Sequence, residues 1–315
     1  GLLLEYSQRE PVERRGHIKA EMVMVSTAGA LAATVVVGVL MNSKPYLGTF
    51  DWGFSFSGLM AFCFVLVVFM IPLSVCCVHE LPKPRQCRDQ TSCHAHVKSS
   101  WELVRKNSFS NLLFFAFLAQ LLFSITTTAG PMVRSRWAEV KVLQQQTFGL
   151  AGLVVMMLAT WIYKVCLLQS SWRKAIFVSI VAIIVFDAIP TFLTIFGVVR
   201  NPYFYLGEDV LGSIPKAALQ LVSNLMIIEL AEPGREGLCF GLINTFQSSS
   251  TPFGAVVSNQ VFGLFSPSLS MLENYVADTS TFRSTVAWSY VLTYSSSLVA
   301  LFLLPMIPWQ KEDAQ

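Results

Sequence analysis

Long apolar runs alternate with polar connections along most of the chain. Each run has about 20 residues or more and lacks a sustained alternation of polar and apolar side chains. A helix needs about 20 residues to cross the roughly 30 Å hydrocarbon layer of a bilayer, whereas a barrel strand has about ten alternating residues. The pattern therefore predicts eight transmembrane helices, at residues 21–41, 54–76, 109–130, 147–167, 175–198, 206–228, 237–265 and 285–307.

The connections between these runs are of two kinds. Most are short, such as residues 41–51 and 167–174, and a short connection makes neighbouring helices antiparallel. The exception is "HELPKPRQCRDQTSCHAHVKSSWELVRKN", which is rich in Pro, basic residues, Cys and His. It predicts three parts, namely the end of an N-terminal helical bundle (1–78), a cytoplasmic linker (79–108) and a C-terminal six-helix bundle with a short tail (109–315).

The position of the linker indicates the architecture. Two predicted spans precede it and six follow it, whereas a twelve-helix transporter of the major facilitator type has six on each side. We therefore expect the last eight helices of such a fold, with four more helices upstream of Gly1.

Composition and charge support a membrane protein. Of 315 residues, 54% are hydrophobic and 13% charged, with a mean hydropathy of +0.57, whereas soluble domains are about 25% charged. The fold class is therefore predicted to be all-α and polytopic. Of the 22 Lys and Arg residues, fifteen fall on the side of the N-terminus and of the linker, and six on the other, which predicts that the former side is cytoplasmic.

Two similar turns lie more than two hundred residues apart. Glu-Pro is followed by charges and a glycine in "REPVERRG" (residues 9–16) and in "AEPGREG" (residues 231–237), each before a long apolar helix. They are expected to be the same cytoplasmic turn in two repeats. Their charges either form gate salt bridges that break during transport or are solvated interfacial groups. The charged residues of these gate turns are Glu10, Glu13, Arg14, Arg15, Glu232, Arg235 and Glu236.

The second half of the chain resembles the folate-biopterin transporter family, a branch of the major facilitator superfamily. The resemblance rests on the order of short motifs in residues 187–265: an aspartate-bearing helix, an acidic helix start, the turn "EPGREG", then Asn244 and "SSS" (residues 248–250). The earlier "YSQREPVERRGHIKAE" is similar to the equivalent inner turn of the family. The resemblance implies a secondary transporter that moves a pterin, folate or related organic anion by alternating access.

Two charged residues fall inside predicted spans. Charges deep in a bilayer are costly and are usually paired or functional. Asp187 follows "IIVF" and precedes Pro190, which is expected to loosen the helix; Lys216 follows Pro215 in the next span. On one interpretation Asp187 binds the aminopyrimidinone edge of a pterin or carries a proton, and Lys216 meets a carboxylate. On the other, the two form a buried ion pair that locks adjacent helices.

Uncharged polar residues add a second set of candidates. Gln220 and Asn224 share one helix face, and the span that contains Asn244 and Gln247 is unusually polar. Such groups need partners, so they line either a water-filled cavity or a helix–helix contact. A break is expected at "TPFG" (residues 251–254) in the span that contains Asn244 and Gln247, and irregular backbone at membrane depth favours the cavity.

Other classes of function lack the necessary motifs. A Walker loop, Gly-x-Ser-x-Gly and His-Glu-x-x-His are absent, and the Cys and His spacing of the linker matches no standard zinc finger. We predict no enzymatic activity, cofactor, metal site or nucleic-acid partner. The expected partners are a small-molecule substrate, protons and the lipid of the plasma membrane or an organelle membrane. The alternative is a non-transporting or degenerate membrane scaffold.

Overall fold

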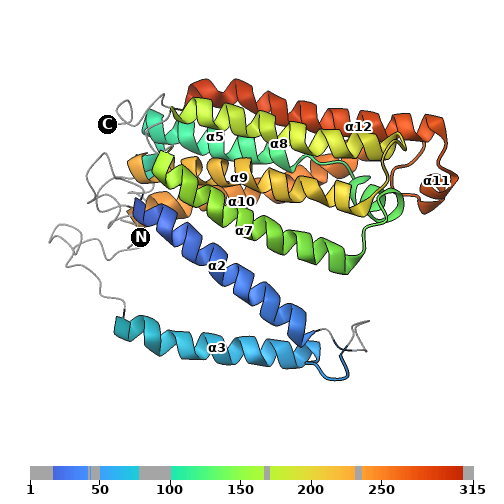
Figure 1. The fold of residues 1–315 in the computed structure, drawn as a ribbon. Helices are drawn as coiled ribbons and strands as arrows, with labels where there is room; N and C mark the ends of the chain where they lie inside the picture. The colour runs from blue at the N-terminus through green and yellow to red at the C-terminus, as the bar shows by residue number, and fades with distance from the viewer. Residues whose placement is uncertain are drawn as a thin grey trace.

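The computed structural model describes residues 17–41, 43, 50–77, 101–166, 171–230 and 236–307. Within these ranges the chain forms helices and no strand, and an isolated bridge joins Ser43 to Phe50. The protein is therefore all-α, as the apolar pattern predicts. Figure 1 shows the arrangement.

Eight long helices and several short ones make up the described chain. The elements are α2 (His17–Leu40), α3 (Phe56–Cys77), α5 (Asn107–Ser124), α6 (Gly130–Met132), the π-helical turn η4 (Val133–Trp137), α7 (Val142–Cys166), α8 (Trp172–Ile195), α9 (Pro202–Leu230), α10 (Glu236–Gly263), α11 (Leu272–Ala277), α12 (Ser280–Val299) and the 3₁₀ helix η5 (Ala300–Met306). Each of the eight predicted spans has a helix at its position.

Most of these helices can cross a bilayer. Six stretches of the described chain are long and apolar enough: His17–Leu40, Phe56–Cys77, Leu143–Val165, Trp172–Ile195, Pro202–Glu229 and Ser280–Met306. The apolar part of α5 is shorter (Phe109–Ser124), and α10 has 28 residues but carries many polar ones. The protein is an integral, multi-pass membrane protein.

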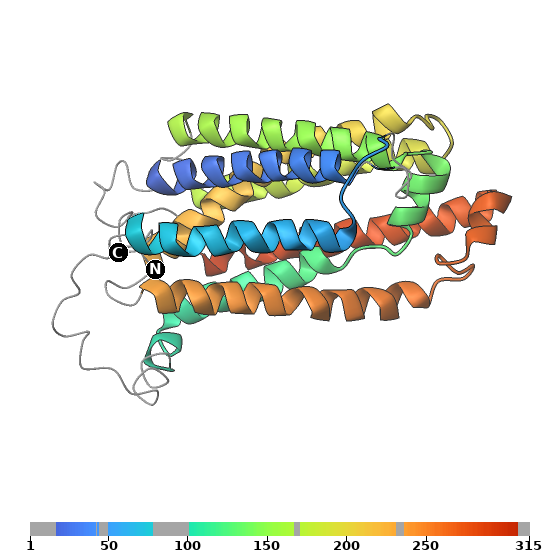
Figure 2. The same ribbon diagram turned by 90° about the horizontal axis from the view of Figure 1, so that it is seen from below.

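The six helices from α5 to α12 form one bundle, built from two groups (Figures 1 and 2). Helix α9 packs against both α7 and α8, and α10 packs on α5. Helix α12 with η5 contacts both α5 and α8 and joins the two groups. We call the end of the bundle that holds η4 and α11 the outer end and the opposite end the inner end, following the charge distribution.

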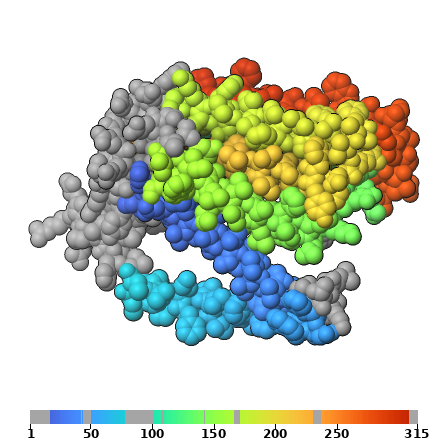
Figure 3. All heavy atoms as spheres, viewed as in Figure 1, coloured from blue at the N-terminus to red at the C-terminus, as the bar shows by residue number. Residues whose placement is uncertain are grey.

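Helices α2 and α3 differ in their contact with the bundle. Helix α2 packs on α7, and its buried residues, Lys19, Ala20 and Thr27, all lie in its first half. In α3 only Leu59 is buried among the side chains described. Figure 3 shows open space between α3 and the bundle. The exposed Phe and Val side chains of α3 suit contact with hydrocarbon.

The predicted span at residues 109–130 ends early, and this differs from the sequence prediction. Helix α5 stops at Ser124, because Ile125 takes an extended conformation (φ −78°, ψ 92°). Three threonines follow, and β-branched residues have a lower helix propensity. Pro131 then begins the short helix α6, since its ring fits the first helical turn.

The backbone groups freed by this break are bound by side chains of other helices. The Ser258 hydroxyl of α10 accepts a hydrogen bond from the Thr126 N–H at 3.1 Å. Ser296 of α12 donates to the Leu122 carbonyl at 3.2 Å, and the hydroxyls of Thr127 and Ser289 are 2.8 Å apart. Irregular backbone is tolerated at membrane depth where the protein supplies such partners.

Helix α10 runs unbroken through residues 251–254, so the break expected there is absent. The irregular backbone instead follows the end of α5. Likewise α8 continues through Pro190. Gly254 lies where α10 meets the end of α5: a Cβ added to it would be 2.3 Å from Ser124 Cβ. The glycine permits the close approach that lets Ser258 reach the break.

This contact gives a testable prediction for Gly254→Ala. The added methyl group would overlap Ser124, and overpacking typically costs about 1–3 kcal/mol. Thermal unfolding in detergent should show a lower Tm than the wild type. Gly241→Ala in the same helix is the control, because its Cβ would meet no atom within 4 Å. Equal Tm values for the two variants would contradict the close contact.

Candidate functional site

Two carboxyl groups meet in the outer half of the bundle. Asp187 lies on α8 and Glu208 on α9, each about two turns from the loop that joins these antiparallel helices, and their side chains are within hydrogen-bonding reach. The Tyr294 hydroxyl of α12 donates to Asp187 Oδ2 at 2.8 Å. The Glu208 side chain is only 7% exposed, and its Oε2 is buried without a hydrogen-bond partner among the described residues.

An arginine stands on the outer side of this carboxyl pair. Arg134 belongs to the π-helical turn η4, and its NH2 lies 3.4 Å from Asp209 and 4.0 Å from Glu208. Its guanidinium group also lies 5.7 Å from the centre of the Tyr205 ring. One cation therefore faces two neighbouring acids of α9, and it is closer to the half-exposed Asp209 than to the buried Glu208.

Tyrosines and a threonine complete the surroundings of the pair. Tyr205 hydrogen-bonds to Tyr290, and the rings of Tyr290 and Tyr294 are 6.1 Å apart. Thr191, one turn from Asp187 on α8, is fully buried and lies beside Tyr294, and the Glu208 Oε2 is buried without a partner in the described chain. Buried polar atoms normally have partners, so this cluster retains unused hydrogen-bonding capacity.

Asp187 and Lys216 are not paired. Among the described residues no ion pair joins their side chains; Glu208 lies beside Asp187, and Lys216 is exposed. Its Nζ reaches back along α9 and would lie 3.6 Å from a Cβ on Gly212. The ion-pair interpretation is therefore wrong. From the sequence alone, Glu208 was treated only as part of an acidic helix start. The short loop between α8 and α9 makes these helices antiparallel, and this was the missed signal that the start of α9 lies next to Asp187.

Helix α9 exposes two stripes of different character. Phe204, Leu211 and Ile214 form an apolar one, whereas Lys216 and Gln220 share a stripe with Asp209. Asn224 is half-buried one turn further on from Gln220. An apolar stripe suits lipid, and a polar one suits water or a solute.

Helix α10 is also divided. A narrow row that includes Cys239, Ile243 and Phe262 is buried, in line with its packing on α5. Asn244 and Gln247 lie beside this row, both half-buried. Within the described chain, no hydrogen bond or ion pair engages the side chains of these two residues or of Lys216, Gln220 and Asn224.

The predicted gate turns fall almost entirely outside the described residues. This applies to Glu10, Arg14, Arg15, Glu232 and Arg235. Glu236 is the first residue of α10, and its side chain is outside the description. Their proposed role as a gate stays a prediction.

Comparison with known proteins identifies the fold. No family model and no curated protein matches the chain. The crystal structure of a bacterial homologue of the iron transporter ferroportin, in its outward-facing state, matches with a TM-score of 0.54 and 14% identity over 95% of this chain. The chain therefore shares its fold with that solved protein. It spans 65% of the length of that solved transporter.

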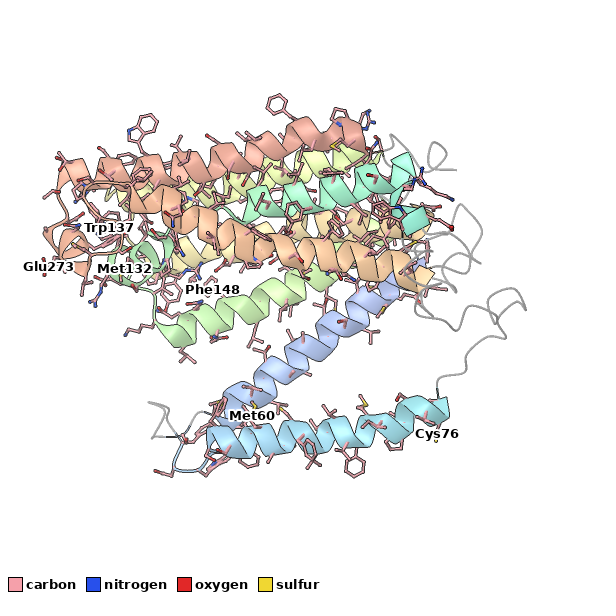
Figure 4. The ribbon with its side chains drawn as sticks, turned by 180° about the vertical axis from the view of Figure 1, so that it is seen from behind. Met60, Cys76, Met132, Trp137, Phe148 and Glu273 are labelled. Carbon is pink, nitrogen blue, oxygen red and sulfur yellow. The ribbon has the colours of Figure 1, made fainter. Side chains whose placement is uncertain are left out.

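The outer end of the bundle is held by a charged cluster next to the site. Asp278 accepts two hydrogen bonds from Arg200, at 2.8 and 3.0 Å, and two from Arg283, at 2.8 and 2.6 Å. The Arg200 guanidinium lies 5.2 Å from the centre of the Trp137 ring, and Trp137 Nε1 donates to the Tyr275 carbonyl at 3.2 Å. Trp137 ends η4, so the cluster holds in place the turn that carries the site arginine (Figure 4).

The charge of Asp278 should make this cluster dependent on pH. Partial burial raises the pKa of Asp278, but the hydrogen bonds from Arg283 and Arg200 outweigh burial and lower the pKa to about 2. Because this pKa lies below the ordinary value of about 3.9, the carboxylate adds stability above about pH 4. That contribution is lost as the pH falls towards about 2.

Asp278→Asn should therefore lower Tm clearly at pH 6 and by a smaller amount at pH 3. Thermal unfolding of the purified protein at the two pH values measures the difference. Glu273→Gln, a change at an exposed acid of α11, is the matched control and should have little effect at either pH. A Tm loss for Asp278→Asn that is the same at both pH values would contradict the ionised cluster.

Proposed function

We propose that the protein is a secondary transporter that moves a pterin, folate or related organic anion by alternating access. The observation that carries the proposal is the set of uncommitted polar side chains on α9 and α10, which includes the exposed cation Lys216. Polar side chains without protein partners inside a membrane protein suit a water-filled path. The transporter fold supports the same class of activity.

The chemistry of these side chains fits such a substrate. Lys216 provides a positive charge for a carboxylate, and charge-assisted hydrogen bonds are the stronger ones. The amides of Gln220, Asn224, Asn244 and Gln247 each offer a donor and an acceptor. A pterin ring presents alternating donors and acceptors along its edge, and amides complement that pattern.

Alternating access requires a contact between the two halves that can open. At the inner end, Glu21 of α2 pairs with Lys164 of α7, and the Lys19 Nζ lies 5.3 Å from the centre of the Phe240 ring of α10. Beyond Thr27, α2 diverges from the bundle (Figure 1). In the proposed cycle this contact closes the cytoplasmic side while the outer side is open.

Uptake of labelled folate and biopterin by cells that express the full-length protein tests the substrate class. Lys216→Gln should raise KM for folate about tenfold, since one charge-assisted hydrogen bond is worth about 1.5–3 kcal/mol. Lys141→Gln, at an exposed position near the outer end, is the control and should transport normally. Absence of both uptake and binding by the full-length protein would favour the non-transporting scaffold.

The inner contact is tested by exchanging its charges. Glu21→Lys should lower the uptake rate about two- to fivefold, because an exposed ion pair contributes about 0.2–1 kcal/mol to the inner-closed state. The double variant Glu21→Lys/Lys164→Glu should restore the rate. Failure of the second change to rescue the first would show that the pair does not stabilise the closed state.

A further inference from the structure

We propose that Asp187 and Glu208 form a proton-binding site in which the two carboxyl groups share one proton, and that Arg134 controls its release. As the coupling site of a carrier, this rests on the proposed function; as a proton site, it stands on the geometry alone. One buried carboxyl oxygen of the cluster, Glu208 Oε2, has no hydrogen-bond partner among the described residues. This atom indicates that the cluster has capacity for a further ligand.

The electrostatics of the cluster favour a single proton over two free charges. Two carboxylates within hydrogen-bonding reach repel each other, and exclusion of water strengthens the repulsion. Arg134 is the only cation that the described residues place against the pair, and it is also bound to Asp209. The remaining titratable groups that face the pair, Tyr205, Tyr290 and Tyr294, are neutral phenols at ordinary pH.

Hydrogen bonding distinguishes the roles of the two acids. Asp187 accepts a hydrogen bond from the Tyr294 hydroxyl, and that bond is stronger to a carboxylate than to a neutral acid. Glu208 lacks a donor at its Oε2. Glu208 therefore carries the shared proton and donates it to Asp187.

Arg134 is placed so that it and the proton can alternate as partners of Glu208. Its NH2 is 3.4 Å from Asp209 and 4.0 Å from Glu208, so a small movement of the guanidinium group transfers it from one acid to the other. When Arg134 turns to Glu208, the ionised form of Glu208 is stabilised and its proton passes to water. When a proton returns to Glu208, Arg134 moves back to Asp209, which is half-exposed.

Infrared spectroscopy of the purified full-length protein in lipid nanodiscs tests the site without reference to transport. A pH titration of the wild type should show a carbonyl band of one buried, protonated carboxyl group near neutral pH. Glu208→Gln should abolish that band, and Asp187→Asn should shift its frequency, because a neutral amide oxygen replaces the charged carboxylate acceptor and accepts a weaker hydrogen bond. Glu273→Gln, remote from the pair, should leave it unchanged.

A variant of Asp209 tests the role of the arginine. Asp209→Asn removes the competing partner of Arg134, so the band of the protonated carboxyl group should disappear at lower pH than in the wild type. Thermal unfolding of every variant shows whether it is folded, and conclusions are drawn from folded variants. Absence of the band in the wild type, or its persistence in Glu208→Gln, would overturn the proposal.

A transport measurement separates this proposal from the previous one. Folate uptake under an imposed pH gradient should accelerate in the wild type and lose its pH dependence in Glu208→Gln. Uptake driven by a sodium gradient and indifferent to pH would overturn the proton site and leave the carrier function standing. A titrating carboxyl band in a protein that moves no folate or biopterin would support the proton site and contradict the proposed carrier function.

Discussion

Polar groups inside a hydrocarbon layer need partners within the protein, and this requirement shapes the whole bundle. The break after α5 is possible because Ser258 and Ser296 bind the freed backbone. The carboxyl group of Asp187 is accepted between helices because Tyr294 donates to it. Where partners are lacking, as at Lys216 and the amides of α10, the same requirement points to water.

The outer end provides the rigidity that the carboxyl pair needs. Asp278 joins two arginines from different parts of the chain, and one of them lies against Trp137 at the end of η4. The position of Arg134 therefore depends on contacts well removed from the acids it faces. A π-helical turn carries this residue, and such turns are frequent at functional sites.

The sequence was sufficient to predict the positions of the helices but not the contacts between them. Apolar runs of about 20 residues predict spans because the thickness of the bilayer is fixed, and all eight have a helix in the structure. The end of α5 could not be predicted, because it depends on Gly254 and Ser258, more than a hundred residues away. Asp187 was chosen as a candidate from its position in a span, but its neighbour depends on how α8 and α9 align. The sequence pattern does not specify that alignment.

The division of the bundle into two groups limits how it can deform. Helix α9 packs on both α7 and α8, and α5 packs on α10, while α12 and η5 contact both groups. Sliding of one group past the other would leave the packing within each group intact. Such a movement would have to change the contacts of α12 and the conformation of the non-helical residues 125–129. Helix α12 would limit the movement, and residues 125–129 would give the chain the freedom to follow it.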